Sequence, residues 1–482
     1  MTTDDVTRVF SQYIEQGHAV IMSVVPAGAT HLAAADPDFV PPERTIPDRS
    51  GDVEDKLPLR PVVDNFDRSL KPVPGAAPLV ELPEIFDNTL ANGVRLLAVQ
   101  NQETPTVTIR AVFDVGQRDE PPGKAGIAQL TTAVMQESTA GLSTDEFSEE
   151  LQRIGASVSI NAGSYQTSVT LNTLERHLEK AVQLMLDRAL KPEFTEGDFA
   201  RVKAQTMEGL MHLRKSPQSL ASRALNSALY GPDHVLAFPG SGLPETVESI
   251  SLDDVKAFYG AHFPQSFSGM LLSSSLPYEQ VISALQGFSD IEVEAVSREP
   301  VPQGKEISGR RIYLVNKDDA AQSSVRLAHH SLTFDALGDY YKSRLMNFPL
   351  GGSSSSRIYL NLREDKGYTY GASTGFSGGR ELGRFGFSSE INKDSTAAAI
   401  EELLRELEVY RSEGMTEAEF EFMQNAVSQS EARQYETPGA KLGLLGNILR
   451  YDLPLNYRSL QKDLLRGTDR ETLNALAGKL IR

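Results

Sequence analysis

The feature that most constrains the fold is an order of strands and helices that occurs twice along the chain. In the first copy, Asn92-Gly93 is a two-residue hairpin signal between strand-like runs, and residues 106–115 alternate as a half-buried strand does. Residues 126–139 then predict a helix, residues 157–174 a strand, and two helical patterns follow between residues 177 and 215. Strands mixed with long helices predict an α+β layering, in which helices cover a sheet.

A similar order returns after about residue 309. Residues 310–317 predict a strand, and helices are predicted across residues 340–350 and 355–367. Two more strands follow before helices return at residue 396. Two units of the same order indicate an internal duplication, so we expect two related domains, each a sheet covered by helices.

A finer repeat concerns the start of the chain. Residues 4–24 align without a gap on residues 253–273, each reading as a helix followed by an apolar strand, and residues 468–482 resemble the same helix. We therefore expect the chain to be the C-terminal portion of a longer two-half protein. The expected division is residues 1–28 as the final element of a preceding half, 29–82 as a linker rich in Pro and Asp, 83–305 as one domain and 306–482 as the other.

The composition argues against several classes of function. With 65 acidic against 47 basic residues the net charge is −18, which disfavours nucleic acid as a partner, and no apolar run approaches the roughly 20 residues that span a bilayer. Because there is no cysteine, any metal would need His and carboxylate ligands. The eight histidines form no H-x-x-E-H or H-E-x-x-H pattern, and the adjacent His329 and His330 would point to opposite faces of a strand. No metal site is therefore expected in this chain.

The predicted helix KAGIAQLTTAVMQEST resembles the segment in which the insulysin/pitrilysin (inverzincin) family of zinc peptidases carries G-L-A-H-x-x-E-H. In that family two histidines four apart bind zinc, and the glutamate between them deprotonates the metal-bound water. Here the three positions are Gln129, Thr132 and Ala133, so no peptidase chemistry is expected at this site. The family's third ligand would fall near Leu210, where the nearest acid, Glu208, reads as a solvated helix residue.

A second stretch, SSRIYLNLREDKGYTYGAST, resembles a segment of the family's C-terminal domains, in which a tyrosine follows an arginine by seven residues. The corresponding residues are Arg363 and Tyr370. The resemblance implies that both reach across a closed chamber to the zinc site of the opposite half and polarise the scissile carbonyl. Taken alone, an arginine on a helix is more often solvated or ion-paired, and a tyrosine in a strand is more often half-buried packing.

A third stretch, SINAGSYQTSV, resembles the family's edge strand, whose backbone pairs with an extended peptide substrate. Asn161 and Ala162 hold the equivalent positions. Since the zinc ligands are missing beside them, a purely structural strand is the favoured interpretation, and peptide binding is the alternative.

The resemblance implies two metallopeptidase-type α/β sandwich domains that form half of a clamshell. It also implies a non-catalytic half or subunit that closes a substrate chamber for oligopeptides. The expected partner is an H-x-x-E-H-bearing peptidase half, which would hold the zinc, and this chain would contribute Arg363 and Tyr370. A structural scaffold and a peptide-binding chaperone or receptor stay open as alternatives. Localisation is open between cytoplasm and periplasm, with the periplasm preferred from the bacterial two-half members.

Overall fold

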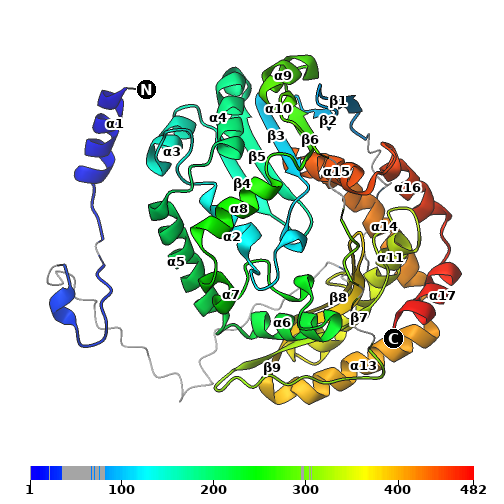
Figure 1. Ribbon diagram of the computed structural model, residues 1–482. Coiled ribbons are helices and arrows are strands. Elements are labelled where there is room, and N and C mark those ends of the chain that lie inside the picture. Colours follow the sequence, from blue (N-terminus) through cyan, green and yellow to red (C-terminus); the bar gives the residue numbers. More distant parts are fainter. Residues whose placement is uncertain are drawn as a thin grey trace. The chain divides into compact units, whose positions relative to one another are not determined.

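The computed structural model in Figure 1 describes residues 2–20, 22–34, 67, 70, 75, 82–294, 298–302, 304 and 307–482. Its internal contacts divide the chain into two compact units, Met1–Val73 and Pro74–Arg482. In the first unit, helix α1 (Thr3–Phe10) begins with a capping box at Thr2, as the predicted helix requires. The strand predicted after it is not formed by the residues described there, and the linker predicted over residues 29–82 falls largely outside the described residues.

The second unit contains a six-stranded sheet in the order β1-β2-β6-β3-β5-β4. β2 and β6 run parallel, and the other neighbours are antiparallel. The strands are β1 (Ile85–Thr89), β2 (Arg95–Gln100), β3 (Thr106–Phe113), β4 (Ser157–Ala162), β5 (Thr167–Leu174) and β6 (Phe267–Ser274). The hairpin predicted at Asn92-Gly93 joins β1 to β2, and Gly93 has the positive φ of +86° that this turn needs.

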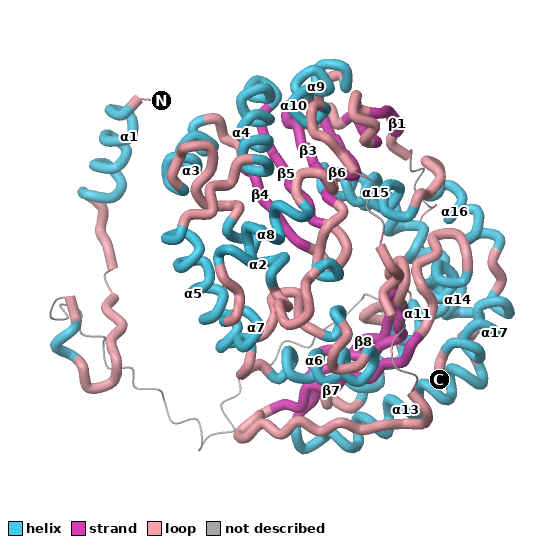
Figure 2. Tube along the Cα trace, in the orientation of Figure 1, coloured by secondary structure: helices cyan, strands magenta, loops and turns pink. Residues whose placement is uncertain are grey.

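The central strands β2, β3 and β6 are buried on both faces, which explains the unbroken apolar run in β2. Side chains alternate along a strand, so Leu96 and Ala98 enter one core cluster while Leu97 and Val99 enter another. The second face is covered by α15 (Pro438–Tyr451), which contacts β2, β3 and β6 although it lies far along the chain (Figure 2). The C-terminal third of the chain therefore helps to build the core of the first sheet.

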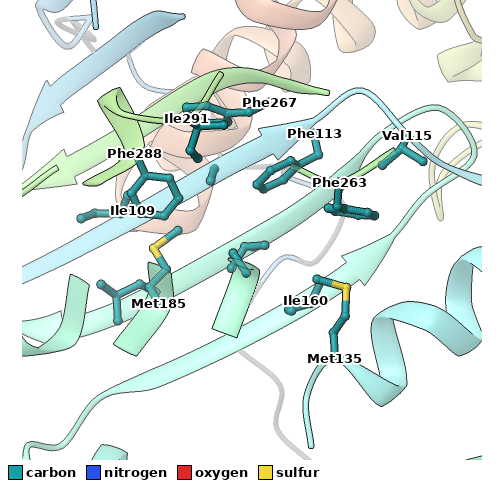
Figure 3. Close-up of a cluster of buried hydrophobic side chains, with 14 of the residues drawn as sticks. Ile109, Phe113, Val115, Met135, Ile160, Met185, Phe263, Phe267, Phe288 and Ile291 are labelled. Atoms are coloured by element: carbon teal, nitrogen blue, oxygen red, sulfur yellow. The ribbon is translucent and has the colours of Figure 1, made fainter. Parts of the chain in front are cut away.

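The first face carries the larger core, shown in Figure 3, where Phe113, Phe263 and Phe267 lie close together. Ile160 of β4 and Met135 belong to the same region. The helices of this part of the chain are α2 (Ile127–Val134), α3 (Thr144–Arg153), α4 (Leu178–Leu190), α5 (Glu196–Leu213), α6 (Pro217–Tyr230), α7 (Pro244–Glu248), α8 (Leu252–His262), α9 (Tyr278–Ala284) and α10 (Gln286–Ser289).

The second sheet has three strands in the order β7-β9-β8, namely β7 (Gln322–His330), β8 (Thr369–Gly378) and β9 (Gly383–Asn392). Apolar residues of β8 and β9 alternate with half-buried or exposed polar ones, so this sheet buries one face in its own core cluster. Its helical segments are α11 (Asp339–Gly351), α12 (Arg357–Tyr359), the π-helical turn η6 (Leu360–Asp365), α13 (Thr396–Glu413), α14 (Glu417–Ser430), α16 (Tyr457–Gly467) and α17 (Arg470–Leu480).

The α+β prediction is confirmed, since helices and sheets are mixed throughout the second unit. In this unit two element predictions are wrong. Residues 157–174 form two strands instead of one, because Gly163 and Gln166 close a turn in which the Gly163 N–H donates to the Gln166 C=O at 2.8 Å. Residues 310–317 are not assigned to a strand, and their Ile312 and Leu314 side chains are exposed. Among the described residues, no helix combines the length and apolar character needed to cross a bilayer.

Candidate functional site

Helix α2, which carries the altered zinc motif, is fixed at its first turn by a buried carboxylate. Glu120 accepts hydrogen bonds from the backbone N–H groups of Gly126 and Ala128, each at 3.1 Å. These are two of the donors that the start of a helix leaves unpaired. Burial nevertheless raises the pKa of Glu120 to about 7, because desolvation outweighs the two hydrogen bonds. The start of α2 therefore holds a carboxyl group that titrates near neutral pH.

The three motif positions on α2 lack the chemistry of a zinc site. Thr132 is buried, and its hydroxyl donates to the C=O of Gln129 at 3.0 Å, so it is turned back onto its own helix. Ala133 has no ligand atom and packs against the core cluster. The exposed Gln129 side chain lies against the backbone at Gly240, where an added Cβ would meet its Nε2 at 2.7 Å. The residues at these positions do not fit the zinc ion that the family motif binds.

The position expected for the third ligand is apolar as well. Leu210 of α5 is buried in the same core cluster as α2, and the two helices are in contact. Glu208 is exposed, because two residues along a helix turn the side chain by about 200°. No group of His, Cys, Asp or Glu residues within the described ranges is arranged to hold a metal ion.

Strand β4, which carries Asn161 and Ala162, lies at the edge of the first sheet and pairs with β5. Asn161 is exposed and Ala162 half-buried. Between them and α2 stands a residue that sequence reasoning missed, Gln136, which follows α2. The Ile160 N–H donates to Gln136 Oε1 at 3.1 Å, and Gln136 Nε2 donates to the Ile160 C=O at 3.3 Å. The carboxamide of Gln136 is thus bound to the backbone of the edge strand.

Arg363 lies on η6, a π-helical turn that follows the short helix α12. Its side chain is 41% exposed, forms an ion pair with Glu364 at 3.4 Å, and donates from Nη1 to the Tyr359 hydroxyl. The guanidinium also lies over the Tyr359 ring, 5.1 Å from its centre. Gly367, with a φ of +66°, then ends the turn and leads into β8. Arg363 therefore rests on one aromatic side chain and remains partly exposed to solvent.

Tyr370 projects from β8, the edge strand of the second sheet, and is 87% exposed. The ladder to β9 shifts between Thr369 and Ala372, so Tyr370 and Gly371 form a bulge. The backbone groups freed by this bulge are paired with buried hydroxyls. The Gly371 N–H donates to Thr369 Oγ1 at 3.1 Å, and Ser389 Oγ donates to the Gly371 C=O at 2.9 Å. The bulge is therefore a fixed feature that directs Tyr370 outward.

The predicted residues form two groups, one on each sheet. Gln129, Thr132 and Ala133 lie on α2, which contacts β4 and so brings them beside Asn161 and Ala162. Arg363 lies on η6 and Tyr370 on β8, two elements that contact each other. Sequence reasoning missed Gln136, Tyr359 and the Thr369 and Ser389 hydroxyls. The available signal for Gln136 was its position four residues after Thr132, which is one turn further along the predicted helix.

Comparisons with known proteins agree with these motifs. A model of the insulinase family (peptidase family M16) matches residues 95–236, and a model of the peptidase M16 inactive domain matches residues 249–427. The chain is 23% identical over 374 residues to a non-peptidase homolog, YmxG, of Helicobacter pylori, a match that covers 76% of this chain and 84% of that protein. It is 23% identical over 407 residues to an uncharacterized zinc protease, YmxG, of Bacillus subtilis, covering 82% of this chain and 95% of that protein.

A solved structure supports the fold. The peptidase M16 inactive domain from Pseudomonas fluorescens superimposes with a TM-score of 0.73 at 23% identity, over 83% of this chain and 95% of that one. Both family models and the fold point to the same group of proteins, and the motif that would bind zinc is replaced on α2. The chain belongs to the insulinase family of peptidases, M16, and is a non-catalytic member of it.

Proposed function

We propose that this chain is the non-catalytic half of a two-part zinc peptidase that acts on oligopeptides. The active half would carry H-x-x-E-H, its zinc and its general base. This chain would close the substrate chamber and present Arg363 and Tyr370 to the scissile carbonyl. A heterodimeric arrangement of this kind gives a function to a chain whose own motif positions do not fit zinc.

The observation that carries the proposal is the presentation of two donors by a rigid support. Tyr370 is 87% exposed on a bulge that is fixed by buried hydroxyls. A tyrosine that served only to pack the sheet would be expected to lie at least half-buried. Arg363 lies seven residues before Tyr370, on a π-helical turn, and such turns often occur at functional sites.

The chemistry of these two side chains suits a developing oxyanion. A guanidinium brings a fixed positive charge and several N–H donors, and a phenol brings an O–H donor. A tetrahedral intermediate of peptide hydrolysis places negative charge on the former carbonyl oxygen, which such donors stabilise more strongly than the neutral carbonyl. Both groups stabilise the oxyanion by donating hydrogen bonds, which requires no metal bound to this chain.

The test mixes this chain with an H-x-x-E-H-bearing half and follows cleavage of a quenched fluorescent peptide. We expect no cleavage by this chain alone and cleavage by the pair. Arg363→Ala should lower the turnover of the pair by about 10² to 10³, the usual effect of removing one such donor. A pair that remains fully active with Arg363→Ala would disprove the assigned role.

Matched controls separate this effect from general damage. Arg411→Ala removes an arginine on α13 that is 46% exposed and ion-paired to Glu408, so its surroundings resemble those of Arg363. Tyr370→Phe, which removes the second donor, should also lower turnover, and Tyr313→Phe is its control because Tyr313 is exposed as well. Both controls should leave turnover unchanged.

The second candidate is a scaffold or peptide-binding subunit without a part in catalysis. The position of β4 at a sheet edge favours it, since an edge strand can take an extended peptide through main-chain hydrogen bonds, with Asn161 and Ala162 in the pairing segment. In that case Arg363→Ala and Tyr370→Phe should change the activity of no partner, and labelled peptide should bind this chain alone.

A further inference from the structure

The edge of β4 offers a very short stretch of backbone to a pairing strand. In an antiparallel ladder, successive residues direct their N–H and C=O groups alternately to one neighbour and to the other side. The Gly163 N–H donates to Gln166 across the turn to β5, so the odd-numbered residues face β5 and the even-numbered ones face outward. Val158, Ile160 and Ala162 are therefore the three outward residues of the strand.

Both ends of this stretch are covered by the chain itself. The Ala156 N–H donates to the Leu151 C=O at 3.0 Å, at the end of α3. Beyond Ala162, the Gln117 and Arg118 N–H groups each donate at 3.0 Å, to the C=O groups of Gly163 and Ser164. A peptide that extends this sheet must accordingly pair along Val158–Ala162, with Ile160 at the centre.

The central position is already filled by Gln136. One carboxamide both accepts from the Ile160 N–H at 3.1 Å and donates to the Ile160 C=O at 3.3 Å. This is the pair of hydrogen bonds that a residue of an added strand would make with Ile160. Gln136 Nε2 also donates to the Thr132 C=O at 3.2 Å, which ties the side chain to α2. The outward groups of Val158 and Ala162 have no hydrogen-bond partner in the part of the chain that the structure describes.

We propose that Gln136 is a gate residue, which closes a peptide-binding edge on β4 by occupying the place of a substrate strand at Ile160. The inference rests on the proposed function, in which the active half holds and cleaves the peptide. Under this inference, peptide binds at the active half and not at β4 of this chain. An open edge beside positions that lack zinc ligands would hold peptide where nothing cleaves it, and the closed edge leaves the peptide to the active half.

The experiment measures peptide binding by this chain alone, so a failure to stimulate a partner would not affect the result. The probe is a fluorescein-labelled peptide of about ten residues, alternating Thr and Val with Lys at both ends, which favours an extended conformation. Gln136→Ala should lower its Kd at least about tenfold, the equivalent of about 1.4 kcal/mol. Gln183→Ala, which changes an exposed glutamine on α4, should bind as the wild type does.

Amide hydrogen exchange reports on the same atoms. In the wild type the Ile160 N–H should be protected, in Gln136→Ala it should exchange faster, and added peptide should restore protection at Val158, Ile160 and Ala162 together. If Gln136→Ala does not fold, Gln136→Leu keeps the bulk of the side chain and removes both hydrogen bonds, with the same expected exchange pattern.

Three results would overturn the proposal. The first is that the wild type binds the peptide as tightly as the variant does. The second is that the variant loses protection at Ile160 without gaining affinity for the peptide. In the third, the variant would associate with itself in sedimentation instead of binding peptide, which would make Gln136 a guard against edge-to-edge aggregation.

Discussion

The two sheets of residues 82–482 both end in an edge strand flanked by a short helical segment, but they treat that edge differently. At β4, a side chain after α2 turns onto the strand, and the Gln136 carboxamide fills the backbone positions of Ile160. At β8, a bulge interrupts the ladder, and the side chains of Tyr370 and of Arg363 on η6 remain exposed. One edge is closed by a side chain and the other displays two donors. The difference arises from a few side chains, so substitutions can test each arrangement separately.

The largest expected effect comes from reintroducing a carboxylate beside α2. Leu210→Glu places a charge in the cluster that Leu210 now fills, and we expect a loss of about 3 to 5 kcal/mol in the free energy of unfolding. Leu210→Met keeps the volume and should cost less than about 1.5 kcal/mol. Urea denaturation of the two variants makes the measurement. Equal stabilities would mean that Leu210 is not packed as described.

A combined variant tests whether the backbone of this region is still suited to a metal. Gln129→His and Ala133→His, added to Leu210→Glu, place three metal ligands, two histidines and one glutamate, on two contacting helices. Zinc should then raise the midpoint of unfolding relative to the metal-free variant, since a ligand that binds the native state stabilises it. The wild type should show no such shift.

The next effect concerns how each helical segment begins. The first turn of α2 is bound by the buried Glu120, whereas α12 follows Ser356, whose hydroxyl donates to the Ser353 C=O instead of capping the helix. The folded-state pKa of Glu120, about 7, lies above the unfolded value of 4.5. The folded state therefore holds a proton that the unfolded state releases, and stability should fall as pH rises from 4.5 to 7, by up to about 3 kcal/mol.

Glu120→Gln should remove this loss between pH 4.5 and 7, measured as urea unfolding free energies at pH 5 and pH 8. The exposed Glu245→Gln serves as the control and should keep the wild-type pH dependence. A wild-type profile retained by Glu120→Gln would assign the pH dependence to other groups.

A third substitution tests what holds the bulge in β8. Thr369 is buried, and its Oγ1 accepts the Gly371 N–H at 3.1 Å and donates to the Glu390 C=O at 2.6 Å, so Thr369→Val removes both hydrogen bonds. We expect a loss of about 1 to 3 kcal/mol, against little change for the exposed Thr104→Val. If the bulge collapses, Tyr370 turns to the other face, and the stimulation of an active half should be lost as well. A stable Thr369→Val variant with full stimulation would show that the hydroxyl does not hold Tyr370.

Sequence reasoning recovered the features that depend on local patterns. Alternation and helical spacing predicted the α+β layering, and the motif spacing identified Gln129, Thr132 and Ala133 on one helix. It failed where a contact joins residues far apart in sequence. No local signal pairs Gln136 with Ile160 or Thr369 with Ser389, because those contacts depend on the register between strands and on how α2 meets the sheet. The run at residues 310–317 has a strand pattern, yet a strand also needs a partner, which its own sequence cannot supply.

The smallest expected effect concerns the support of Arg363. Tyr359→Phe removes the hydroxyl that accepts from Arg363 but keeps the ring beneath the guanidinium. Because the contact lies at the surface, stability should change by less than about 0.5 kcal/mol. Stimulation of an active half should still fall by about 2- to 10-fold, as expected for one net hydrogen bond that orients Arg363. Tyr313→Phe should change neither quantity. If stimulation survives Tyr359→Phe and falls only in Tyr359→Leu, the ring positions Arg363, and the π-helical turn with its stacked guanidinium is sufficient to direct the donors outward.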